Sequence, residues 1–544
     1  MSLRLIAATA LMWAVSANVS CKDSASSEPS PGKGKGEKKV PGAARRGGST
    51  MAEGPAVRPA RLAGSWYDKD SKTLRRRLRG WMKESAKEEA KKTPRGRLLA
   101  VVSPHAGYRF SGRTAASAYR LVAAAKPKRV FVLGPSHYAP IRAVVVVDGA
   151  RFATPLGPLT IDATARAALL RHALFRRAPK VDLREHSVEM QMPFIKAVAP
   201  NATVVPLIVS ALTLHEVRRV ADALRALLRP GDLIVASSDF THRGPRYHYQ
   251  PFLGKNDVPR RLRKLDMEAF RFFEGGDLPA FWRFKHGKDD TICGFYPLSI
   301  VRAILGPKIR GTLLRYDTSG RVLGDYTDSV SYLAVAFNAS GPAKDPWALI
   351  QPALTPRFLT RHEAKLAVRI ARKALEYHFA YPQRASFDAR KAGLVTPGRL
   401  TQTHGVFVTL KEPRGRLRGC IGHTIGQMPL YRGIVTDGLN AALRDPRFSP
   451  VTAGELSKLR IEVTVLTPPR AVSGPEAITI GRDGIILRKG KRGALFLPQV
   501  AVEQGWGLRR TLSALAHKAG LGYDGWRGAH FEVFEGYVYE EEGR

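Results

Sequence analysis

The chain contains 544 residues, of which 44% are hydrophobic and 25% are charged. This composition is typical of a globular protein and excludes a fibrous or wholly disordered chain. The length exceeds what one hydrophobic core accommodates, so we expect at most three or four domains, or two large ones. Lys and Arg total 88 against 46 for Asp and Glu, which gives a formal net charge of +42.

This positive charge has two interpretations. It favours either a solvated basic surface or binding to an anionic partner such as nucleic acid or a membrane. The basic residues are spread along the chain, from 75–77 through 260–264 to 488–492, without interleaved aromatic residues or a recognisable nucleic-acid-binding motif. We therefore expect a solvated basic surface rather than specific binding of nucleic acid.

The N-terminal residues predict an exported protein. Arg4 precedes an apolar run over 5–15, which is too short to cross a bilayer and is typical of a signal peptide over 1–21. Cys21, which ends it, is a candidate lipoprotein cysteine. Residues 22–57 are rich in Ser, Pro, Gly and Lys and predict a disordered tether. The sequence thus predicts a membrane-anchored lipoprotein, the alternatives being a cleaved soluble protein or a cytoplasmic one with a spurious signal.

Three short apolar runs in the first half of the chain each lead to a histidine. The runs are 98–102, 130–133 and 233–236, and the histidines are His105, His137 and His242. Runs this rich in Val, Ile and Leu predict strands buried on both faces of a parallel sheet. Because such sheets bind ligands at the carboxyl ends of their strands, the three histidines can converge on one cleft. One such histidine is more often structural, but three in register predict a metal site.

The remaining elements of this half extend the same pattern. We expect a helix over 114–125 and a fourth buried strand over 204–209, although a proline at 206 weakens the strand pattern. The alternation of strands and helices predicts an α/β domain over 58–338 with a largely parallel central sheet. His186 and Glu189, three residues apart, would share a helix face that either lines the cleft or is an ordinary polar surface.

Seven motifs in this domain resemble, in order, those of the Memo family. They are GSWY at 64–67, PHAGY at 104–108, LGPSH at 133–137, ATPLG at 153–157, EHSVEM at 185–190, SSDFTH at 237–242 and TICG at 291–294. Memo proteins resemble class III extradiol dioxygenases in fold and hold a metal through two histidines and one cysteine. The resemblance implies that the metal ligands here are His105, His137 and Cys293. It also implies that His186, Asp239 and His242 line the same cleft as candidate catalytic residues.

The implied ligands have consequences for the chemistry. Two imidazoles and a thiolate suit copper and also accept iron or zinc, and we expect one copper or iron ion rather than zinc. Three protein ligands leave a fourth position open, as reactive sites require. Asp239 or His242 would exchange protons with a substrate or orient a ligand. Cys293 is alternatively a small buried residue without a metal.

Activity is not decided by the resemblance. The Memo family includes redox-active metal proteins and non-catalytic binding proteins. One implied function is therefore a metal-dependent, dioxygenase-like oxidoreductase that acts on a small organic substrate. The other is a scaffold that keeps the cleft for binding a ligand or peptide.

After a linker over 339–354, residues 355–544 predict a smaller α+β domain. Thr360 and Glu363 form a capping-box pattern ahead of an amphipathic helix. Alternating runs at 405–410 and 459–466 predict strands with one solvated face. This domain resembles the AMMECR family through LRGCIG at 417–422, DPRF at 445–448, LPQVA at 497–501 and QGW at 504–506.

Cys420 lies between the two glycines of the first of these motifs. A tight turn there would either present a reactive thiol beside Arg418 or need glycine for its backbone and leave the cysteine buried, and we favour the second interpretation. A nucleophilic pair with His423 is sterically awkward on one turn. His404 or His530 would have to be brought close by the fold.

Memo-like and AMMECR-like proteins resemble two components of the AmmeMemoRadiSam system, which are joined here in one chain. The resemblance implies a radical SAM protein as a partner. The iron-sulfur chemistry of such a partner requires a reducing compartment, which conflicts with the predicted export. Either this chain works separately from that partner or the signal is spurious.

Overall fold

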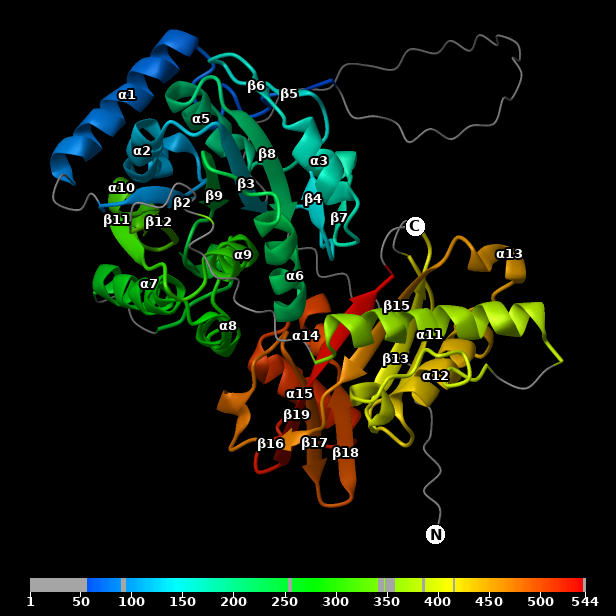
Figure 1. The fold of residues 1–544 in the computed structure, drawn as a ribbon. Helices are drawn as coiled ribbons and strands as arrows, with labels where there is room; N and C mark the ends of the chain where they lie inside the picture. The colour runs from blue at the N-terminus through cyan, green and yellow to red at the C-terminus, as the bar shows by residue number, and fades with distance from the viewer. Residues whose placement is uncertain are drawn as a thin grey trace, which may run out of the picture. The chain divides into compact units, whose positions relative to one another are not determined.

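The computed structural model describes residues 56–89, 94–252, 257–340, 347, 358–383, 387–413 and 416–541. The predicted signal peptide, the candidate lipoprotein residue Cys21, nearly all of the predicted tether and most of the predicted linker lie outside the described residues. None of the described helices combines the length and the apolar composition that a bilayer crossing requires. The described chain forms two domains, each built on its own large sheet (Figure 1).

The first domain is built on a nine-stranded sheet with the order β10-β12-β2-β9-β3-β8-β4-β7, and β11 pairs with β12. Its strands are β2 Arg97–Ser103, β3 Arg129–Pro135, β4 Val144–Val146, β7 Phe175–Arg176, β8 Thr203–Val209, β9 Asp232–Ser237, β10 His242–Arg243, β11 Gly311–Thr318 and β12 Ser329–Ala339. A smaller sheet contains β1 Val57–Arg58, β5 Arg151–Phe152 and β6 Leu159–Thr160. The buried strand predicted over 204–209 is present as β8.

The large sheet is mixed, which corrects the expectation of a largely parallel sheet. Strands β2, β9, β3 and β8 are parallel neighbours. The long strand β12, however, pairs antiparallel with β2 and with β11, and β4 pairs antiparallel with β8. The parallel part is thus the centre of the sheet, and antiparallel strands flank it on both sides.

Helices cover both faces of this sheet (Figure 1). Residues of α1 Ser71–Glu88, α2 Tyr108–Ala125 and α5 Met192–Val198 share one hydrophobic cluster with Val132 of β3. The hydrophobic cluster on the opposite face contains Phe131 and Leu133 of β3. Four helices contribute to it: α6 Leu214–Arg225, α7 Val258–Gly275, α8 Leu278–Gly287 and α9 Phe295–Leu305. Shorter helices are α3 Ala163–Leu170, α4 Pro179–Asp182 and α10 Ser319–Leu323. Alternate residues of one strand therefore enter opposite layers of the core.

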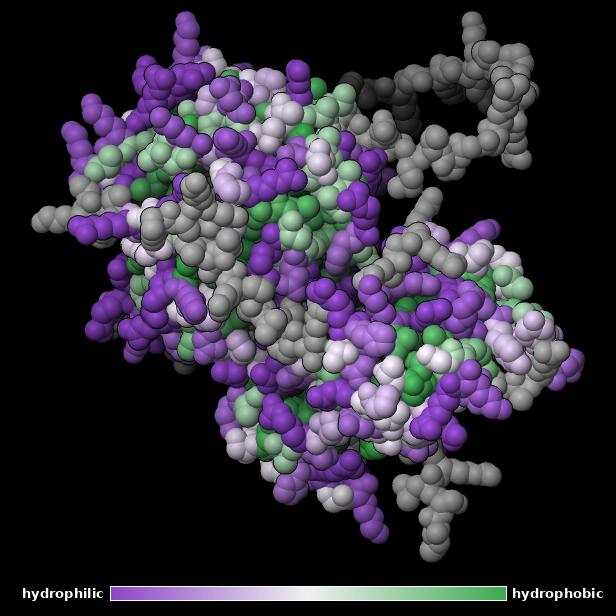
Figure 2. Space-filling model, in the orientation of Figure 1, coloured by the Kyte–Doolittle hydropathy of each residue, from purple (hydrophilic) through white to green (hydrophobic). Residues whose placement is uncertain are grey.

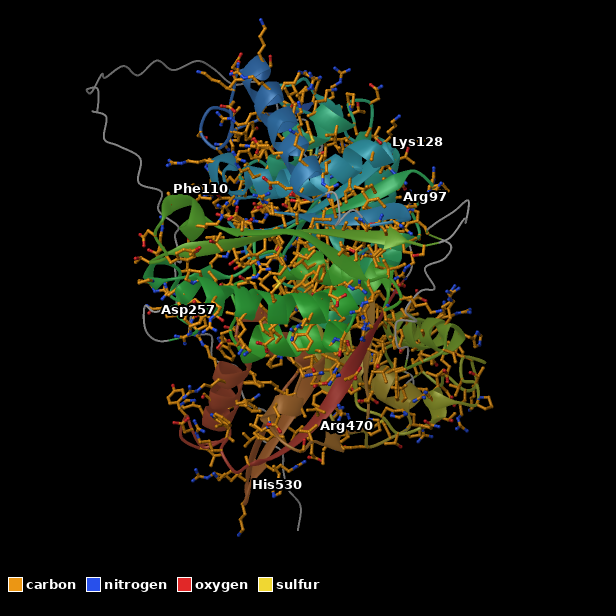
Figure 3. The ribbon with its side chains drawn as sticks, turned by 90° about the vertical axis from the view of Figure 1, so that its left-hand side faces the viewer. Arg97, Phe110, Lys128, Asp257, Arg470 and His530 are labelled. Carbon is orange, nitrogen blue, oxygen red and sulfur yellow. The ribbon has the colours of Figure 1, made fainter. Side chains whose placement is uncertain are left out.

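The parallel strands run in one direction, which defines two ends of the sheet. Arg97, where β2 begins, and Lys128, just before β3, lie at one end in Figure 3, and Phe110, shortly after the end of β2, lies toward the other. The predicted helix over 114–125 is observed as α2, which begins earlier because Gly107 is its N-cap. The segments that follow β2, β3 and β9 consequently share one edge.

The second domain has a seven-stranded sheet with the order β14-β13-β15-β19-β17-β18, and β16 pairs with β19. Its strands are β13 Val406–Lys411, β14 Leu417–His423, β15 Arg460–Leu466, β16 Arg470–Ala471, β17 Asp483–Lys489, β18 Arg492–Phe496 and β19 His530–Glu540. Its helices are α11 Arg361–Ala380, α12 Leu430–Leu443, α13 Ala453–Leu456, α14 Pro498–Glu503 and α15 Leu508–Lys518. All of its strand pairs are antiparallel.

Its first helix begins as the sequence predicts. The Thr360 hydroxyl accepts a hydrogen bond from the Glu363 backbone N–H, and the Glu363 carboxylate accepts one from the Thr360 N–H. This capping box starts α11, whose Ile370 packs in one core with Val408 of β13 and Ile434 of α12. The expected α+β architecture is observed.

Candidate metal centre

Three adjacent parallel strands deliver the candidate site residues. β9 lies between β2 and β3 and is parallel to both. His105 follows the end of β2, His137 follows the end of β3, and Asp239 follows the end of β9. Because parallel strands end at the same edge, these side chains gather there as the sequence predicts.

Cys293 completes a compact group of donor atoms. It precedes α9, and its Sγ lies 3.2 Å from Nε2 of His105. One ligand atom from each of His105, His137 and Cys293 lies within 4.8 Å of the others, a spacing that one cation can bridge. The predicted ligands, 188 residues apart in the case of His105 and Cys293, are thus brought together by the fold.

The tautomer of His105 follows from its hydrogen bonds. Its Nδ1 lies 2.9 Å from the Ser237 hydroxyl, and that hydroxyl donates its one proton to the Ser187 carbonyl at 2.7 Å. The Gln191 amide also donates to the Ser237 oxygen, at 2.8 Å. The hydroxyl must therefore accept the Nδ1 proton, which leaves the Nε2 lone pair facing Cys293. This is the arrangement that a histidine ligand needs.

His137 is oriented by Glu185, whose side chain is fully buried. The Glu185 carboxylate lies 2.9 Å from His137 Nδ1 and also accepts the backbone N–H groups of His137, His186 and Ser187. Burial alone would raise the pKa of Glu185, but its hydrogen bonds and charge interaction with His137 outweigh burial and hold that pKa well below its ordinary value. An ionised Glu185 thus accepts the Nδ1 proton and leaves His137 Nε2 available to a cation.

Burial shifts the pKa of two of the predicted ligands, His105 and Cys293. It lowers the pKa of His105, an effect that neighbouring His137 reinforces, so the imidazole is neutral as ligation requires. Burial, followed by the charge of Asp239, raises the pKa of the Cys293 thiol. The thiol proton must therefore leave when the sulfur binds a cation. The donor set fits one soft or borderline transition-metal ion.

The three candidate catalytic residues lie in the same cluster. The His186 ring stacks on His137 at 4.3 Å between centroids and contacts Trp66 at 4.7 Å. Asp239 accepts the His105 backbone N–H at 2.8 Å, and one of its carboxylate oxygens lies 3.9 Å from His105 Nε2. A ligand atom of His242 lies within 4.8 Å of those of Asp239 and Cys293. The structure therefore joins all six predicted residues in one site.

His242 is held by backbone oxygens. Its Nδ1 lies 2.9 Å from the Phe240 carbonyl and 3.1 Å from the Thr291 carbonyl. Since carbonyls only accept, Nδ1 carries a proton, and Nε2 is the free acceptor. Burial lowers the pKa of His242. The ring is thus a neutral proton acceptor beside the predicted ligands.

A cavity of about 250 Å³ adjoins this site. It is lined by Arg61, Leu62, Tyr138, Leu183, Arg184, Glu185, His186 and Glu189. Glu185, which orients His137, and His186, which stacks on the His137 ring, both line the cavity, so the cavity lies beside the cluster. Its guanidinium and aromatic walls offer space for a small organic molecule.

Sequence reasoning missed three residues that orient the ligands: Glu185, Gln191 and Ser237. Glu185 and Ser237 lie inside the Memo-like motifs, which mark their position but not their role. A signal for Glu185 exists, because an acidic residue directly before a site histidine is a candidate partner of imidazole. Nothing local indicates that Gln191 reaches the Ser237 hydroxyl.

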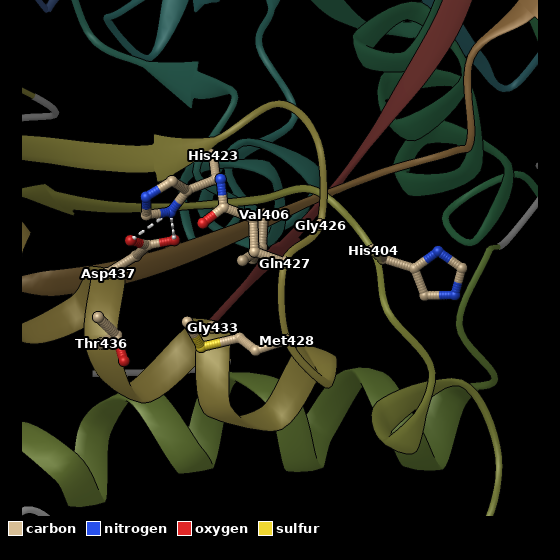
Figure 4. Close-up of a pocket in the computed structure, with 9 residues that line it drawn as sticks. All are labelled: His404, Val406, His423, Gly426, Gln427, Met428, Gly433, Thr436 and Asp437. Atoms are coloured by element: carbon tan, nitrogen blue, oxygen red, sulfur yellow. Dashed lines mark hydrogen bonds and ion pairs between the residues drawn. The ribbon is translucent and has the colours of Figure 1, made fainter. Parts of the chain in front are cut away.

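The second domain places Cys420 and the histidines apart. The Cys420 sulfur lies 3.1 Å from the Thr409 hydroxyl, and among the described residues no imidazole is hydrogen-bonded to it. His423 instead lies 3.1 Å from the buried Asp437 carboxylate through Nδ1 (Figure 4). His404 lies at the other end of the same small pocket, with its ring turned away from this pair. A thiol–imidazole pair involving Cys420 is therefore not formed.

Comparisons with known proteins agree with both domains. A family model described as Memo-like protein matches residues 58–336, and one described as AMMECR1 matches residues 368–539. Protein MEMO1 of Homo sapiens is 30% identical over 299 residues, which is 53% of this chain and 99% of the relative. Protein MK0488 of Methanopyrus kandleri is 43% identical over 195 residues, which is 34% of this chain and 91% of the relative.

Among solved structures, the uncharacterized protein PH0010 from Pyrococcus horikoshii is 36% identical, with a TM-score of 0.30, and the match covers 34% of this chain and 94% of that one. The two family models match in succession along one polypeptide, and the first spans more than half of it. The chain belongs to the Memo family and carries an AMMECR1 domain after its Memo domain.

Proposed function

We propose that the first domain binds one copper or iron ion through His105 Nε2, His137 Nε2 and Cys293 Sγ, and acts as a redox protein of the AmmeMemoRadiSam type. One observation carries the proposal: the Nδ1 proton of each imidazole is already accepted, by Ser237 and by Glu185, so each Nε2 keeps its lone pair as a possible ligand. The lone pair of His105 Nε2 faces the Cys293 sulfur at 3.2 Å and becomes available to a cation when the thiol loses its proton. Such partners fix the tautomer and orientation of metal-binding histidines. A thiolate beside two imidazoles favours copper or iron over the harder cations.

Bound copper or iron would supply electron transfer with oxygen or a small organic substrate. The protein's own residues supply positioning and proton transfer. His242, one ring nitrogen of which lies within 4.8 Å of ligand atoms of Asp239 and Cys293, has an unprotonated Nε2 that can take a proton from a substrate hydroxyl. Asp239, whose pKa is raised by burial, can hold a proton beside His105. His186, packed against Trp66 and His137, lines the adjoining cavity and can position a substrate beside the ligands.

A second function is favoured by the adjoining cavity. Its arginines, Arg61 and Arg184, and the Tyr138 ring can bind an anionic ligand or a peptide side chain without chemistry. In this alternative the cleft is a recognition site on a scaffold protein. Both functions use the same cleft, so a measurement of turnover distinguishes them, whereas a measurement of binding alone does not.

Elemental analysis tests the metal site. The purified chain is compared with a His105→Ala, Cys293→Ala variant and with a control variant, His404→Ala, Cys420→Ala, that removes the same residue types from the second domain. We expect about one copper or iron per chain in the parent and the control, and none in the first variant. Metal in all three, or in none after loading, contradicts the proposal.

Oxygen uptake separates catalysis from binding. The metal-loaded chain is mixed with catechols, and oxygen consumption is recorded with and without His242→Ala. Uptake that the His242→Ala variant loses supports the redox function. Retained metal with no uptake, together with saturable binding of an aromatic anion, supports the scaffold function.

Location and partner are parts of the proposal that rest on sequence. We propose attachment to a membrane by a lipid on Cys21, and a radical SAM protein as a functional partner. Labelling of cells with radioactive palmitate tests the first: label in the parent and none in Cys21→Ser is expected. Co-purification with a radical SAM protein from the same cells tests the second. Absence of label or of co-purification contradicts the corresponding part of the proposal and does not bear on the metal site.

A further inference from the structure

The exposed face of α1 carries an uninterrupted stripe of positive charge. The stripe consists of Lys72, Arg75, Arg76, Arg79, Lys83 and Lys87, all of which are exposed. At about 100° per residue, these six positions fall within roughly 120° of the helix circumference. Purple side chains stand out over α1 at the upper left of Figure 2. The basic residues of this helix are thus gathered on one face.

The opposite face of α1 fixes this orientation. Leu74 and Leu78 are fully buried, in the cluster that α1 shares with α2. Ser85 is also buried and donates a hydrogen bond to Glu89. The helix therefore cannot rotate about its axis without exposing these residues, and the stripe stays directed at solvent.

The acidic residues of α1 lie off the stripe. Glu84 is paired with Arg113, and Glu88 is paired with Arg315 at 2.6 Å. Arg77, the remaining arginine of the helix, also lies off the stripe and pairs with Asp68 at 3.2 Å. Within the described part of the chain, the charges around the stripe are neutralised by partners while the stripe itself is not.

None of the six stripe residues forms an ion pair or a side-chain hydrogen bond with a described residue. Like charges at spacings of three and four repel one another along a helix, so the arrangement costs stability in the free protein. An anionic partner placed against the stripe would offset this repulsion by attracting the six cations. The stripe runs from Lys72 to Lys87 of this 18-residue helix, a length of about 22 Å at about 1.5 Å per residue.

We propose that the α1 stripe docks on an anionic phospholipid surface. A flat leaflet of anionic headgroups can contact all six cations of a straight helix at once. The stripe has no aromatic side chain for stacking on bases and no amide for reading base edges, which disfavours a nucleic acid as its partner. α1 is also the first helix of the described chain after the predicted anchor at Cys21, so an anchor there would keep the stripe near a membrane.

Vesicle co-sedimentation tests the proposal with the full chain. Every protein carries Cys21→Ser, so that no acyl chain contributes to binding. The vesicles are phosphatidylcholine alone or phosphatidylcholine with 30% phosphatidylglycerol, at about 0.1 M salt, where the Debye length is about 10 Å. The test variant is Arg75→Glu, Arg76→Glu, Arg79→Glu.

The control variant is Lys264→Glu, Arg271→Glu, Lys308→Glu. Its three residues are exposed, belong to the same domain and change the net charge by the same amount. On α7 the basic residues are interleaved with Glu268 and Glu274, so α7 presents no uninterrupted stripe. Circular dichroism checks that both variants keep their helix content.

A basic residue near an anionic leaflet contributes about a fivefold increase in binding. Removing three such residues predicts that the α1 variant binds phosphatidylglycerol vesicles at least about 100-fold more weakly than the parent, because the added glutamates are also repelled by the leaflet. The control variant should stay within about threefold of the parent. The parent should not bind vesicles of pure phosphatidylcholine. Equal losses in both variants would show that net charge alone binds and would overturn the proposal. Loss of duplex DNA binding by the α1 variant, with unchanged vesicle binding, would overturn it in favour of a nucleic acid.

Discussion

The Ser237 hydroxyl, at the end of β9, lies 2.9 Å from His105 Nδ1 and donates a hydrogen bond to the Ser187 carbonyl. Replacing Ser237 by Ala removes the acceptor for the Nδ1 proton, so the ring is free to adopt the other tautomer or to rotate. We expect the Ser237→Ala variant to bind copper about 10- to 100-fold more weakly, the usual loss for a residue that orients a metal ligand. Competition with a chromophoric chelator measures the dissociation constant.

A matched serine shows whether this loss is specific. Ser85, on α1, is likewise buried, but it donates a hydrogen bond to Glu89, the C-cap of α1, outside the ligand cluster. The Ser85→Ala variant should bind copper as the parent does. Equal affinities of the Ser237→Ala variant and the parent would show that Ser237 does not set the tautomer of His105.

Glu185 combines structural and electrostatic roles. Its carboxylate accepts three backbone N–H groups, from His137, His186 and Ser187, besides the His137 ring nitrogen. In the Glu185→Gln variant an amide NH₂ would face one of these donors, and the charge that stabilises the Nδ1 proton of His137 would be lost. We expect the unfolding free energy to fall by about 1–3 kcal/mol, because buried donors lose their acceptor.

The same variant should bind copper more weakly, by about 10- to 100-fold. Urea denaturation and chelator competition measure the two effects separately. A variant that is as stable as the parent and binds metal equally well would show that the carboxylate charge is dispensable at this position.

Much of this site is predictable because it depends on local patterns. Three apolar runs ending in histidine predict buried strands, and the rule that parallel strands present ligands at their carboxyl ends predicts that His105 and His137 meet. The structure confirms both steps. The capping box at Thr360 is equally local, since it needs only two residues three positions apart.

The rest depends on contacts between distant segments. The strand β12 is inserted antiparallel beside β2, and no pattern within 329–339 specifies its direction or its neighbour. Gln191 reaches the Ser237 hydroxyl across 46 residues of chain, and only the fold reveals that pairing. Hydrophobic periodicity reports which residues are buried, but it does not report which polar groups meet inside.

Gly294, next to Cys293, has no room for a side chain. A Cβ at this position would lie 2.2 Å from the Ser238 Cβ and 2.8 Å from the Ser237 carbonyl oxygen. The Gly294→Ala variant must therefore move the start of α9 away from the end of β9, and Cys293 moves with it. We expect a loss of about 1–3 kcal/mol in unfolding free energy, typical of overpacking, together with weaker metal binding.

Gly287, at the end of α8, is the matched control, because a Cβ there meets nothing within 4 Å. The Gly287→Ala variant should be as stable as the parent or slightly more stable, since alanine restricts the unfolded chain. Thermal denaturation followed by circular dichroism compares the two. If both variants have the same melting temperature as the parent, α9 tolerates the displacement and Gly294 has no packing role.

Asp266 on α7 provides a pH-dependent test of the buried network beneath the site. Its carboxylate is fully buried and accepts hydrogen bonds from the Thr241 N–H at 3.2 Å and the Tyr316 hydroxyl at 2.8 Å. Burial, with a smaller contribution from Asp290, raises the pKa of Asp266 to about 7. In the unfolded chain the pKa of an aspartate is about 3.9.

Between about pH 4 and pH 7 the folded protein therefore holds a proton on Asp266 that the unfolded chain has lost. The unfolding free energy must decrease as pH rises through this window, and the loss is complete above the folded pKa. The Asp266→Asn variant has no such proton. Relative to the parent, it should gain about 2–4 kcal/mol of stability between pH 4.5 and pH 8, because one bound proton changes the unfolding free energy by about 1.4 kcal/mol for each pH unit.

Urea denaturation of the parent and the Asp266→Asn variant at pH 4.5, 6 and 8 measures this difference directly. The comparison cancels the titration of the other groups, because both proteins share them. If the unfolding free energies of the two proteins change equally with pH, Asp266 is ionised in the folded state across this range. The hydrogen bonds from Thr241 and Tyr316 would then be strong enough to offset its burial, since both stabilise the charged carboxylate.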